Sequence, residues 1–385
     1  MASFARPAGP LIWMHGASVG EGLALLPIVN RLVARGVHVL ITSGTVSSAR
    51  ILADRLPSGA THQYIPFDSP AYVRRFFDHW RPNLAMVAES ELWPNFILEA
   101  RQRSVPLLLI NARLSDKSYN RWRLAPRAIK ALLSRIELVL TQSEEDAERL
   151  LALGAPRIRV AGNLKYDAPP PPVSALALAE MKAAIGSRPV WLAASTHPEE
   201  ENAVIEAHLA VAALRPDLLT IVAPRHTERG VEIAAAAQAR GLAAALRSRA
   251  DPLFPNTTFY IADTMGEMGL FYRLSGLVFV GKSLSGATGG QNPIEPAKLG
   301  AAVLHGPAVG NFRDVYNAID SADGATLVNN AEELADALET LLANPARARR
   351  LTHAAAEAVG RLCGATDNVM NAIEPYLMQM LAARP

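Results

Sequence analysis

The chain has 385 residues. A single hydrophobic core of typical size does not accommodate so many residues, so two domains of roughly 190 residues each are predicted. Hydrophobic residues make up 50% and charged residues 19%, which excludes a disordered chain. The net charge of +2 gives no general support for nucleic-acid binding, and the single cysteine, Cys363, excludes an internal disulfide and favours a reducing compartment.

No run of about 18 apolar residues occurs, and the first residues lack the apolar core of a signal peptide. The chain as given is therefore expected to be soluble or peripheral. Positive charges gather in one short stretch, at Arg121, Arg123, Arg127, Lys130 and Arg135. A solvated helix face is the plainer interpretation of this stretch, and a surface for phosphate-bearing lipid is the sharper one.

From Leu11 onward, short runs of Val, Ile and Leu alternate with amphipathic stretches, which is typical of strands and helices in βα order. Strands are predicted at Leu11–Met14, His38–Thr42, Gln63–Pro66, Leu84–Ala88, Pro106–Ile110, Leu138–Thr141 and Ile158–Ala161. Helices are predicted at Leu23–Ala34, Pro70–Trp80, Asn95–Arg103, Trp122–Ser134 and Glu144–Leu153. The pattern indicates a doubly wound, mostly parallel sheet.

Four consecutive prolines, Pro169 to Pro172, then interrupt the pattern, because proline cannot continue a helix or a central strand. Such a run favours an extended linker. The predicted organisation is a first domain at residues 1–167, a linker at 168–173, a second domain at 174–360, and a C-terminal helix at 361–385 that crosses back to the first domain.

The βα alternation resumes after the linker and predicts a second domain of the same class. Its strands are expected at Val190–Ala194, Leu218–Ala223, Phe259–Ile261, Leu277–Val280 and Ala302–Leu304. Its helices are expected at Glu199–Leu214, Glu228–Arg240, Gly266–Leu274, Pro293–Leu299 and within residues 331–383. Two such domains are expected to leave a cleft between the carboxyl ends of their strands, where open-sheet proteins bind ligands.

Glu21 lies at the first strand-to-helix junction, in the segment His15-Gly16-Ala17-Ser18-Val19-Gly20-Glu21-Gly22. The glycine spacing is not a dinucleotide fingerprint, so it gives little support for NAD binding. A carboxylate here can simply favour the helix dipole, which spacing alone makes the better interpretation, or it can act as a general base.

Two further junctions of the first domain carry charged side chains. Glu89 and Glu91 follow a predicted strand, where one can cap the next helix while the other faces the cleft. Lys165 follows the last strand before the linker and could meet an anionic leaving group or a sugar carboxylate. A solvated surface lysine is the plainer alternative.

The second domain offers groups suited to a nucleotide. Gly289 and Gly290 precede a helix start at Asn292-Pro293-Ile294-Glu295, which suits a phosphate at the helix N-terminus and a sugar hydroxyl against the carboxylate. Further candidate groups lie at Val280-Gly281-Lys282-Ser283, Ser195-Thr196-His197, Pro224-Arg225-His226 and Met265-Gly266-Glu267. Together they indicate the nucleotide end of a sugar-nucleotide site. No metal-ligand spacing and no Gly-X-Ser-X-Gly elbow occur, so neither a metal site nor a serine hydrolase is predicted.

Taken together, these segments closely resemble the 3-deoxy-D-manno-octulosonic acid (Kdo) transferases of lipopolysaccharide assembly, from about Trp13 to Tyr376. The resemblance is carried by Ser18-Val19-Gly20-Glu21, Glu89-Ser90-Glu91-Leu92-Trp93-Pro94-Asn95, Asn111-Ala112-Arg113-Leu114-Ser115, Gly162-Asn163-Leu164-Lys165-Tyr166-Asp167, Ser195-Thr196-His197, Pro224-Arg225-His226, Asp263-Thr264-Met265-Gly266-Glu267 and Asn292-Pro293-Ile294-Glu295. It implies an α/β protein of the GT-B class, with two Rossmann-like domains facing each other across a cleft.

The resemblance further implies an inverting enzyme that moves Kdo from CMP-Kdo to the lipid A precursor, with no metal or other cofactor. Glu21 matches the family's general base, and Glu89 and Lys165 match positions that stabilise the transition state. The CMP-binding segments match Pro224, Arg225, Met265, Gly266, Glu267, Ser283, Asn292, Pro293, Ile294 and Glu295. The implied location is the cytoplasmic face of the inner membrane, with no nucleic-acid partner.

Two residues depart from the family pattern, because Lys282 stands where many relatives have a second glycine and Gln291 where histidine is common. Members also usually begin with a hydrophobic anchor helix, so a shortened chain or a peripheral membrane surface is expected here. The alternatives are another GT-B enzyme, such as a UDP-sugar transferase or a sugar-nucleotide 2-epimerase, and a non-catalytic two-domain protein that closes on a ligand.

Overall fold

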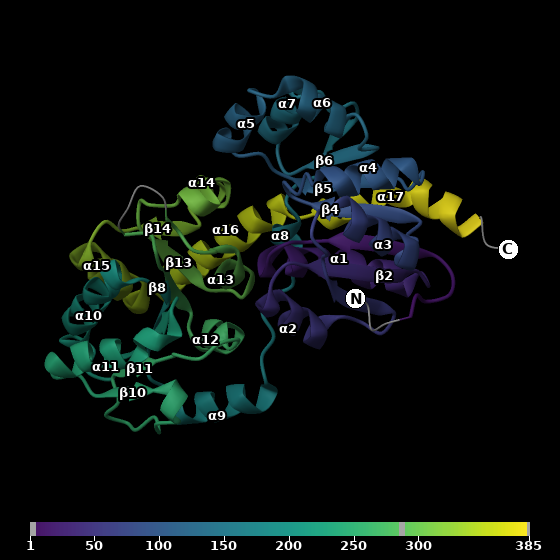
Figure 1. Ribbon diagram of the computed structural model, residues 1–385. Coiled ribbons are helices and arrows are strands. Elements are labelled where there is room, and N and C mark those ends of the chain that lie inside the picture. The colour runs from purple at the N-terminus through teal and green to yellow at the C-terminus, as the bar shows by residue number, and fades with distance from the viewer. Residues whose placement is uncertain (1–4, 285–288, 383–385) are drawn as a thin grey trace. The chain divides into compact units, whose positions relative to one another are not determined.

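The computed structural model describes residues 5–284 and 289–382. These residues form two compact units, one containing the described residues up to Ala168 together with those from Leu362, and the other containing Pro169–Arg361. Each unit is built on its own seven-stranded parallel sheet, with helices packed on the sheet (Figure 1).

The sheet of the first unit has the strand order β3-β2-β1-β4-β5-β6-β7. Its strands are β1 Leu11–His15, β2 His38–Ser43, β3 Ala60–Tyr64, β4 Leu84–Ala88, β5 Leu107–Ala112, β6 Leu138–Thr141 and β7 Ile158–Val160. Its helices are α1 Val19–Ala34, α2 Val46–Arg55, α3 Pro70–Trp80, α4 Pro94–Gln102, α5 Asp116–Trp122, α6 Pro126–Leu133, α7 Glu144–Ala152, α8 Leu164–Asp167 and α17 Ala365–Ala382.

The central strand β1 is buried on both faces, as expected of a parallel sheet covered by helices. Successive residues of β1 point to opposite faces of the sheet and so pack into two different hydrophobic cores. Ile12 and Met14 join the core under α1 and α17. Trp13 points the other way and packs its ring edge to face with Phe76 of α3 at a centroid distance of 5.0 Å. This packing fixes the direction of β1 and the position of the loop that follows it.

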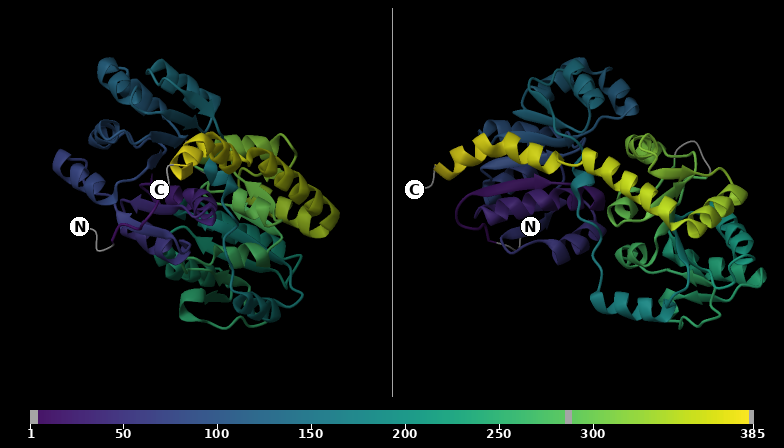
Figure 2. Two further views of the ribbon diagram at one scale, coloured as in Figure 1. Left: turned by 90° about the vertical axis from the view of Figure 1, so that its right-hand side faces the viewer. Right: turned by 180° about the vertical axis from the view of Figure 1, so that it is seen from behind.

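The helix α17 belongs to the first unit although it ends the chain. Figure 2 shows it, in yellow, running along this unit. Asp167 accepts a hydrogen bond from Gly364 N at 2.7 Å just before α17 begins, and Arg35, directly after α1, pairs with Glu374 of α17 at 2.5 Å. Cys363, expected inside a helix, lies instead in the connection before α17, where its thiol donates to Tyr166 O.

The second unit repeats the architecture with the order β10-β11-β9-β8-β12-β13-β14. Its strands are β8 Val190–Thr196, β9 Leu219–Pro224, β10 Ala244–Leu246, β11 Phe259–Ile261, β12 Leu277–Val280, β13 Ala302–His305 and β14 Ala325–Leu327. Its helices are α9 Ala175–Ile185, α10 Pro198–Ala212, α11 Gly230–Ala239, α12 Met268–Leu274, α13 Ile294–Lys298, α14 Arg313–Asp320, α15 Ala331–Ala343 and α16 Pro345–Leu362, with short 3₁₀ turns at Thr227–Arg229, Arg247–Arg249 and Gly310–Phe312.

The proline run is extended and packs against α12 of the second unit. Arg273 donates to Pro171 O at 2.9 Å, and a Cβ placed at Gly269 would lie only 2.2 Å from Pro172 O. Glycine at position 269 is therefore what allows this part of the linker to approach the helix so closely.

Two predicted elements of the first unit were wrong in extent. The helix expected at 122–134 begins only at Pro126, as α6, because Pro126 has no N–H and starts a helix at its first position; the preceding helix α5 was not predicted. The strand expected at Gln63–Pro66 lies earlier, at Ala60–Tyr64, because proline cannot donate to a ladder. The helices α2, α8, α9 and α14 and the edge strands β10 and β14 were also not predicted.

Candidate active site

Both sheets have a point where the strand order changes direction, and open α/β sheets bind ligands outside the strand ends at such points. In the first sheet it lies between β1 and β4, and in the second between β8 and β12. All these strands are parallel, so the loops that follow each pair lie at one edge of their own sheet. The predicted Glu21 and Glu89 follow β1 and β4, and Ser283 follows β12.

Glu21 lies in the first turn of α1, and only 9% of it is exposed. Its carboxylate accepts hydrogen bonds from Ala17 N at 2.8 Å and from Ser18 Oγ at 2.7 Å. Ser18 caps the helix. A Cβ at Gly16 would lie 3.1 Å from the Cβ of Glu21, so glycine lets the loop close around this side chain. Each oxygen accepts one of these bonds and retains a lone pair for a substrate hydroxyl.

Glu89 and Lys165 form an ion pair with a distance of 2.5 Å between Nζ and Oε1. Both side chains are partly shielded from water, so the pair is screened less than a surface pair. A Cβ at Gly20, the residue before Glu21, would lie 3.9 Å from Cε of Lys165. The structure therefore brings the three predicted catalytic residues together within the first unit.

Asn111, at the end of β5, positions the segment that carries Lys165. Asn111 is 1% exposed, and its side-chain oxygen accepts a hydrogen bond from Leu164 N at 2.9 Å. The backbone carbonyl of Asn111 accepts one from Gln142 Nε2 at 3.0 Å. Asn163 then accepts a bond from Lys165 N at 3.0 Å. These contacts fix the start of α8 and so direct the lysine toward Glu89.

Glu91 and His15 complete the polar surroundings of this site. Burial raises the pKa of Glu91, a hydrogen bond from Trp93 opposes that change, and the negative charges of Glu21 and Glu89 add to it. Burial lowers the pKa of His15 to about 4, so its ring is neutral near pH 7. His15 Nε2 lies 4.0 Å from Glu91 Oε2. The two carboxyl groups of this loop thus have different environments, which agrees with the different roles considered for them.

In the second unit, the buried carboxylate of Glu200 holds the loop after β12. It accepts hydrogen bonds from the backbone N–H groups of His197 at 3.0 Å, of Ser283 at 3.3 Å, and of Lys282. Burial raises the pKa of Glu200, although these N–H groups favour its charged form. A Cβ at Gly281 would lie 2.6 Å from Glu200 Oε1, so this position requires glycine.

The positive groups of the second unit gather at the same strand ends. Burial lowers the pKa of His197, and the positive charges of Lys282 and Arg225 lower it further. Gln291 Nε2 lies 3.1 Å from His197 Nε2, and the His226 ring meets the His197 ring edge to face. The guanidinium of Arg225 is exposed and forms no ion pair with any described residue. It is therefore free to bind an anion.

The remaining predicted nucleotide-binding residues lie on neighbouring loops of this unit. Pro224 ends β9, and Asn292 donates to the Glu295 carboxylate at 3.2 Å at the start of α13, where Pro293 and Ile294 begin the helix. Met265 is exposed beside Gly266, before α12.

Two of the predicted side chains are already engaged within the protein. Ser283 is fully buried, and its hydroxyl donates to Val280 O and accepts from Gly306 N. The carboxylate of Glu267 is paired with Arg247 at 2.7 Å, and this pairing lowers the pKa of Glu267. These two residues shape their loops, and their contact with a nucleotide stays a prediction.

Comparison with known proteins decides the family. The model of the 3-deoxy-D-manno-octulosonic-acid transferase (kdotransferase) family matches residues 2–168. The chain is 36% identical over 355 residues to the probable mitochondrial 3-deoxy-D-manno-octulosonic acid transferase of Arabidopsis thaliana, covering 89% of this chain and 79% of that protein. The chain belongs to the Kdo transferase family. It is also 35% identical to the 3-deoxy-D-manno-octulosonic acid transferase of Bordetella pertussis, covering 97% of this chain and 90% of the relative.

Solved structures agree on the fold. A glycosyltransferase from Rickettsia africae shares 16% identity and a TM-score of 0.62, covering 98% of this chain and all of that one. A UDP-GlcNAc 2-epimerase from Neisseria meningitidis shares 14% identity and a TM-score of 0.61, covering 96% and 100%. The predicted membership of the Kdo transferases, a glycosyltransferase family, and the predicted class of two Rossmann-like domains of the GT-B type are both confirmed.

In the described ranges, no group of three or more His, Cys, Asp or Glu residues is placed to hold a metal ion. The absence of a cofactor stays a prediction. In the same ranges, no helix is both long enough and apolar enough to cross a membrane.

Backbone strain marks the strand ends of this Kdo transferase family member. Four non-glycine residues at strand ends have left-handed backbones: Glu89 with φ of 57°, Asn111 with 50°, Ser195 with 56° and Lys282 with 57°. Each such residue costs roughly 1–3 kcal/mol. Strain of this kind persists where the surrounding structure fixes it, and it concentrates at functional sites.

The departure at Lys282 has a measurable consequence. Glycine adopts a positive φ without strain, so Lys282→Gly is expected to raise the free energy of unfolding by about 1 kcal/mol. Lys282→Ala removes the charge and keeps the strain, so it should leave stability nearly unchanged. Lys182→Gly, inside α9, is the opposite control and should lower stability by about 1 kcal/mol. Chemical denaturation of the three variants measures this, and a Lys282→Gly variant less stable than wild type would contradict it.

Two positioning residues were missed by sequence reasoning. Asn111 stood within a motif that supported the resemblance, but its link to Leu164 is a contact across 53 positions that no local pattern reveals. Glu200 had a local signal, since its place three residues after His197 matches a capping box, and that box is present. Its second task, holding the loop after β12, depends on strand order.

Proposed function

We propose that this protein transfers Kdo from CMP-Kdo to the lipid A precursor, lipid IVA, with inversion at the anomeric carbon. The observation that carries the proposal is membership of the Kdo transferase family at 36% identity over 89% of the chain. The positions of Glu21, Glu89 and Lys165 around one strand-order change support it.

In the proposed reaction, an acceptor hydroxyl oxygen attacks the anomeric carbon of Kdo. Glu21 takes the hydroxyl proton as the new carbon–oxygen bond forms, and the bond to the CMP phosphate breaks with its electron pair leaving on CMP. Ala17 N and Ser18 Oγ hold the Glu21 carboxylate in place for this step. Inversion by direct displacement needs one such base on the acceptor side.

The donor is proposed to bind through the second unit. CMP carries one phosphate, so the unpaired guanidinium of Arg225 and nearby backbone N–H groups can neutralise it without a divalent ion. Glu295, fixed by Asn292, accepts hydrogen bonds from the ribose hydroxyls. Lys165, held by Glu89, is proposed to stabilise charge that develops in the transition state.

We further propose that the protein acts at the cytoplasmic face of the inner membrane through the basic surface of α5 and α6. This surface is exposed at Arg121, Arg123 and Arg127, and Leu124 between them is 85% exposed. Cationic side chains close to an anionic bilayer contribute roughly 1 kcal/mol each.

Replacing Arg121, Arg123 and Arg127 together by alanine is expected to weaken binding to vesicles containing anionic lipid by about 100-fold, as three contributions of about 1 kcal/mol imply. Vesicle cosedimentation at low and high salt measures this. The matched control replaces Arg347, Arg349 and Arg350, which are exposed on α16, and should leave binding unchanged. Equal vesicle binding by wild type and the first triple variant would rule out this surface.

The proposed activity is tested by mass spectrometry of lipid IVA incubated with the protein and CMP-Kdo generated in situ. A mass increase of one or more Kdo units would establish the transfer and count the additions. Competition between nucleotides separates the rival transferases, since tighter binding of UDP than of CMP would overturn the proposal. A folded protein that binds CMP and yields no product would indicate another acceptor or a binding role.

A further inference from the structure

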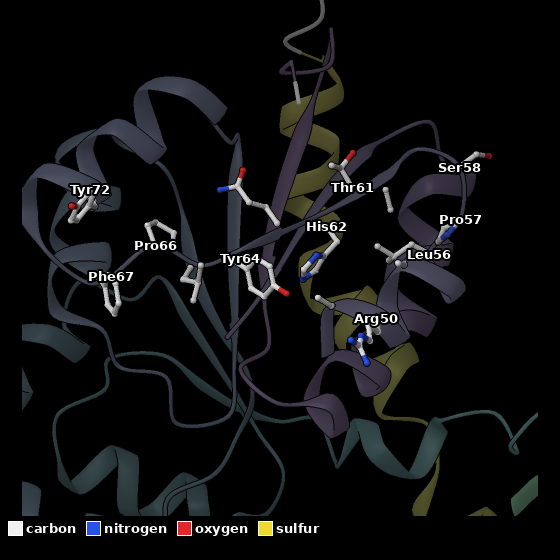
Figure 3. A pocket seen from close by; sticks show the side chains of 15 residues that line it. Arg50, Leu56, Pro57, Ser58, Thr61, His62, Tyr64, Pro66, Phe67 and Tyr72 are labelled. Carbon is white, nitrogen blue, oxygen red and sulfur yellow. The ribbon is translucent and has the colours of Figure 1, made fainter. Parts of the chain in front are cut away.

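An open groove runs along the free edge of the first sheet, in the same unit as Glu21. It has a volume of about 1170 Å³, more than the roughly 300–1,000 Å³ of pockets that bury a drug-sized ligand. The edge strand β3 forms its floor, and the residues that follow β3 extend it toward α3 (Figure 3). Ala53 of α2 and Leu56, which follows this helix, form one wall, and Phe67 and Tyr72 form the other.

The groove is apolar in its chemistry. Phe67 is 83% exposed and Tyr64 and Tyr72 are about half exposed, so three aromatic rings stand in water along a short stretch. Isolated apolar side chains on a surface need no explanation, but a contiguous group of them marks a binding surface.

Two polar side chains that line the groove, His62 and Gln63, have hydrogen-bond partners within the protein. His62 Nε2 lies 2.9 Å from Ser43 Oγ, and Gln63 Oε1 accepts a hydrogen bond from Trp80 Nε1 at 3.1 Å. The side chains of His62 and Gln63 therefore need no polar ligand atom inside the groove. The exposed Arg50 lies on the α2 side and pairs with no carboxylate among the described residues, so it offers a positive charge to an anionic group at the rim.

The groove lies near the strand that leads to Glu21, and hydrogen bonds link the two regions through the protein. Strand β3 is two positions from β1 in the sheet, a distance of about 10 Å at the usual strand spacing. His62 contacts Ser43, the next residue Gly44 donates to Ala17 O, and Ala17 N donates to the Glu21 carboxylate. On its other side α2 packs closely against α1. A Cβ at Gly22 of α1 would lie only 3.3 Å from Leu52 of α2.

We infer that this groove binds an acyl chain of the lipid acceptor while the acceptor's sugar hydroxyl reaches Glu21, an inference that rests on the function proposed above. The length fits, because two strand spacings separate the groove from the end of β1 and a glycolipid head bridges such a distance. The charge fits as well, since Arg50 stands among the residues that line the groove (Figure 3) and can pair with a phosphate of the head while the aromatic rings contact the chain. Desolvation of the chain's methylenes supplies the affinity.

The experiment compares two acceptors, tetraacylated lipid IVA in detergent and the same disaccharide bisphosphate stripped of its acyl chains. Ala53→Trp fills the groove with a large side chain on the exposed side of α2, and Tyr64→Ala removes one aromatic ring from its floor. Each is expected to raise the KM for lipid IVA about tenfold, as losing contact with about two methylenes implies, with the KM for the deacylated acceptor unchanged. The control, Ala152→Trp on the exposed end of α7, should change neither.

Calorimetric titration with lipid IVA in the absence of donor keeps the inference separate from the reaction. Ala53→Trp should raise the Kd for lipid IVA about tenfold, whether or not the wild type transfers a sugar. If this rise occurs and the wild type transfers no sugar, the proposed function is wrong while the acyl-chain groove is supported. Unchanged KM and Kd in both groove variants would overturn the inference. A parallel rise for both acceptors would place the disaccharide in the groove instead. Weaker vesicle binding with unchanged acceptor constants would assign the groove to bilayer lipid.

Discussion

Glu21→Gln is expected to lower kcat for Kdo transfer by about 10²–10⁴-fold, because the amide keeps the shape of the carboxylate and loses its capacity to take a proton. The surrounding contacts predict little structural change, since the amide oxygen can still accept from Ala17 N or Ser18 Oγ. The measurement is steady-state transfer to lipid IVA, followed by mass spectrometry of the product. The affinity for CMP, tested separately, should remain at the wild-type value.

Glu148→Gln is the matched control for this change. Glu148 is exposed on α7 of the same unit, so its replacement removes one charge without touching the site, and kcat should stay within twofold of wild type. A Glu21→Gln enzyme with more than about a tenth of wild-type kcat would show that another group accepts the proton. A non-catalytic role for the protein would instead leave product formation absent in both the wild type and the variant.

Lys165→Met is expected to lower kcat by about 10²–10³-fold, the range for losing one preorganised positive donor. The same change leaves the partly buried Glu89 carboxylate without its partner, at a cost of a few kcal/mol in stability. A double substitution, Glu89→Gln with Lys165→Met, removes both charges and should recover most of that stability while kcat stays low. In the double variant, the free energy of unfolding measured with denaturant should therefore return toward the wild-type value, while kcat in the transfer assay stays low.

Lys117→Met supplies the control for the lysine. Lys117 is exposed on α5 in the same unit and forms no ion pair with a described residue, so its loss should leave both quantities at wild-type values. If the double variant were as unstable as Lys165→Met, the ion pair would not be the source of the lost stability. If Lys165→Met retained wild-type kcat, Lys165 would serve only to hold Glu89 in its left-handed conformation.

The sequence by itself determined the class of fold and the order of its main elements. The continuous apolar run of β1 and the βα alternation specify a parallel sheet, because each strand must be apolar on both faces to lie under helices. Boundaries set by local chemistry were also accessible, and the proline at the start of α3 is one of them. The start of α6 at Pro126 follows from the same rule, although it was not applied there.

The tertiary structure decided which of the marked residues act together. Glu89 and Lys165 are separated by 76 positions, and only the strand order and the Asn111 contact with Leu164 bring them into one ion pair. The same holds for the groove beside β3, whose walls come from α2 and from the segment leading into α3. Local sequence preferences determine which helix or strand each segment can form. Contacts between segments depend on which strands become neighbours, and that is set by packing the whole chain into sheets.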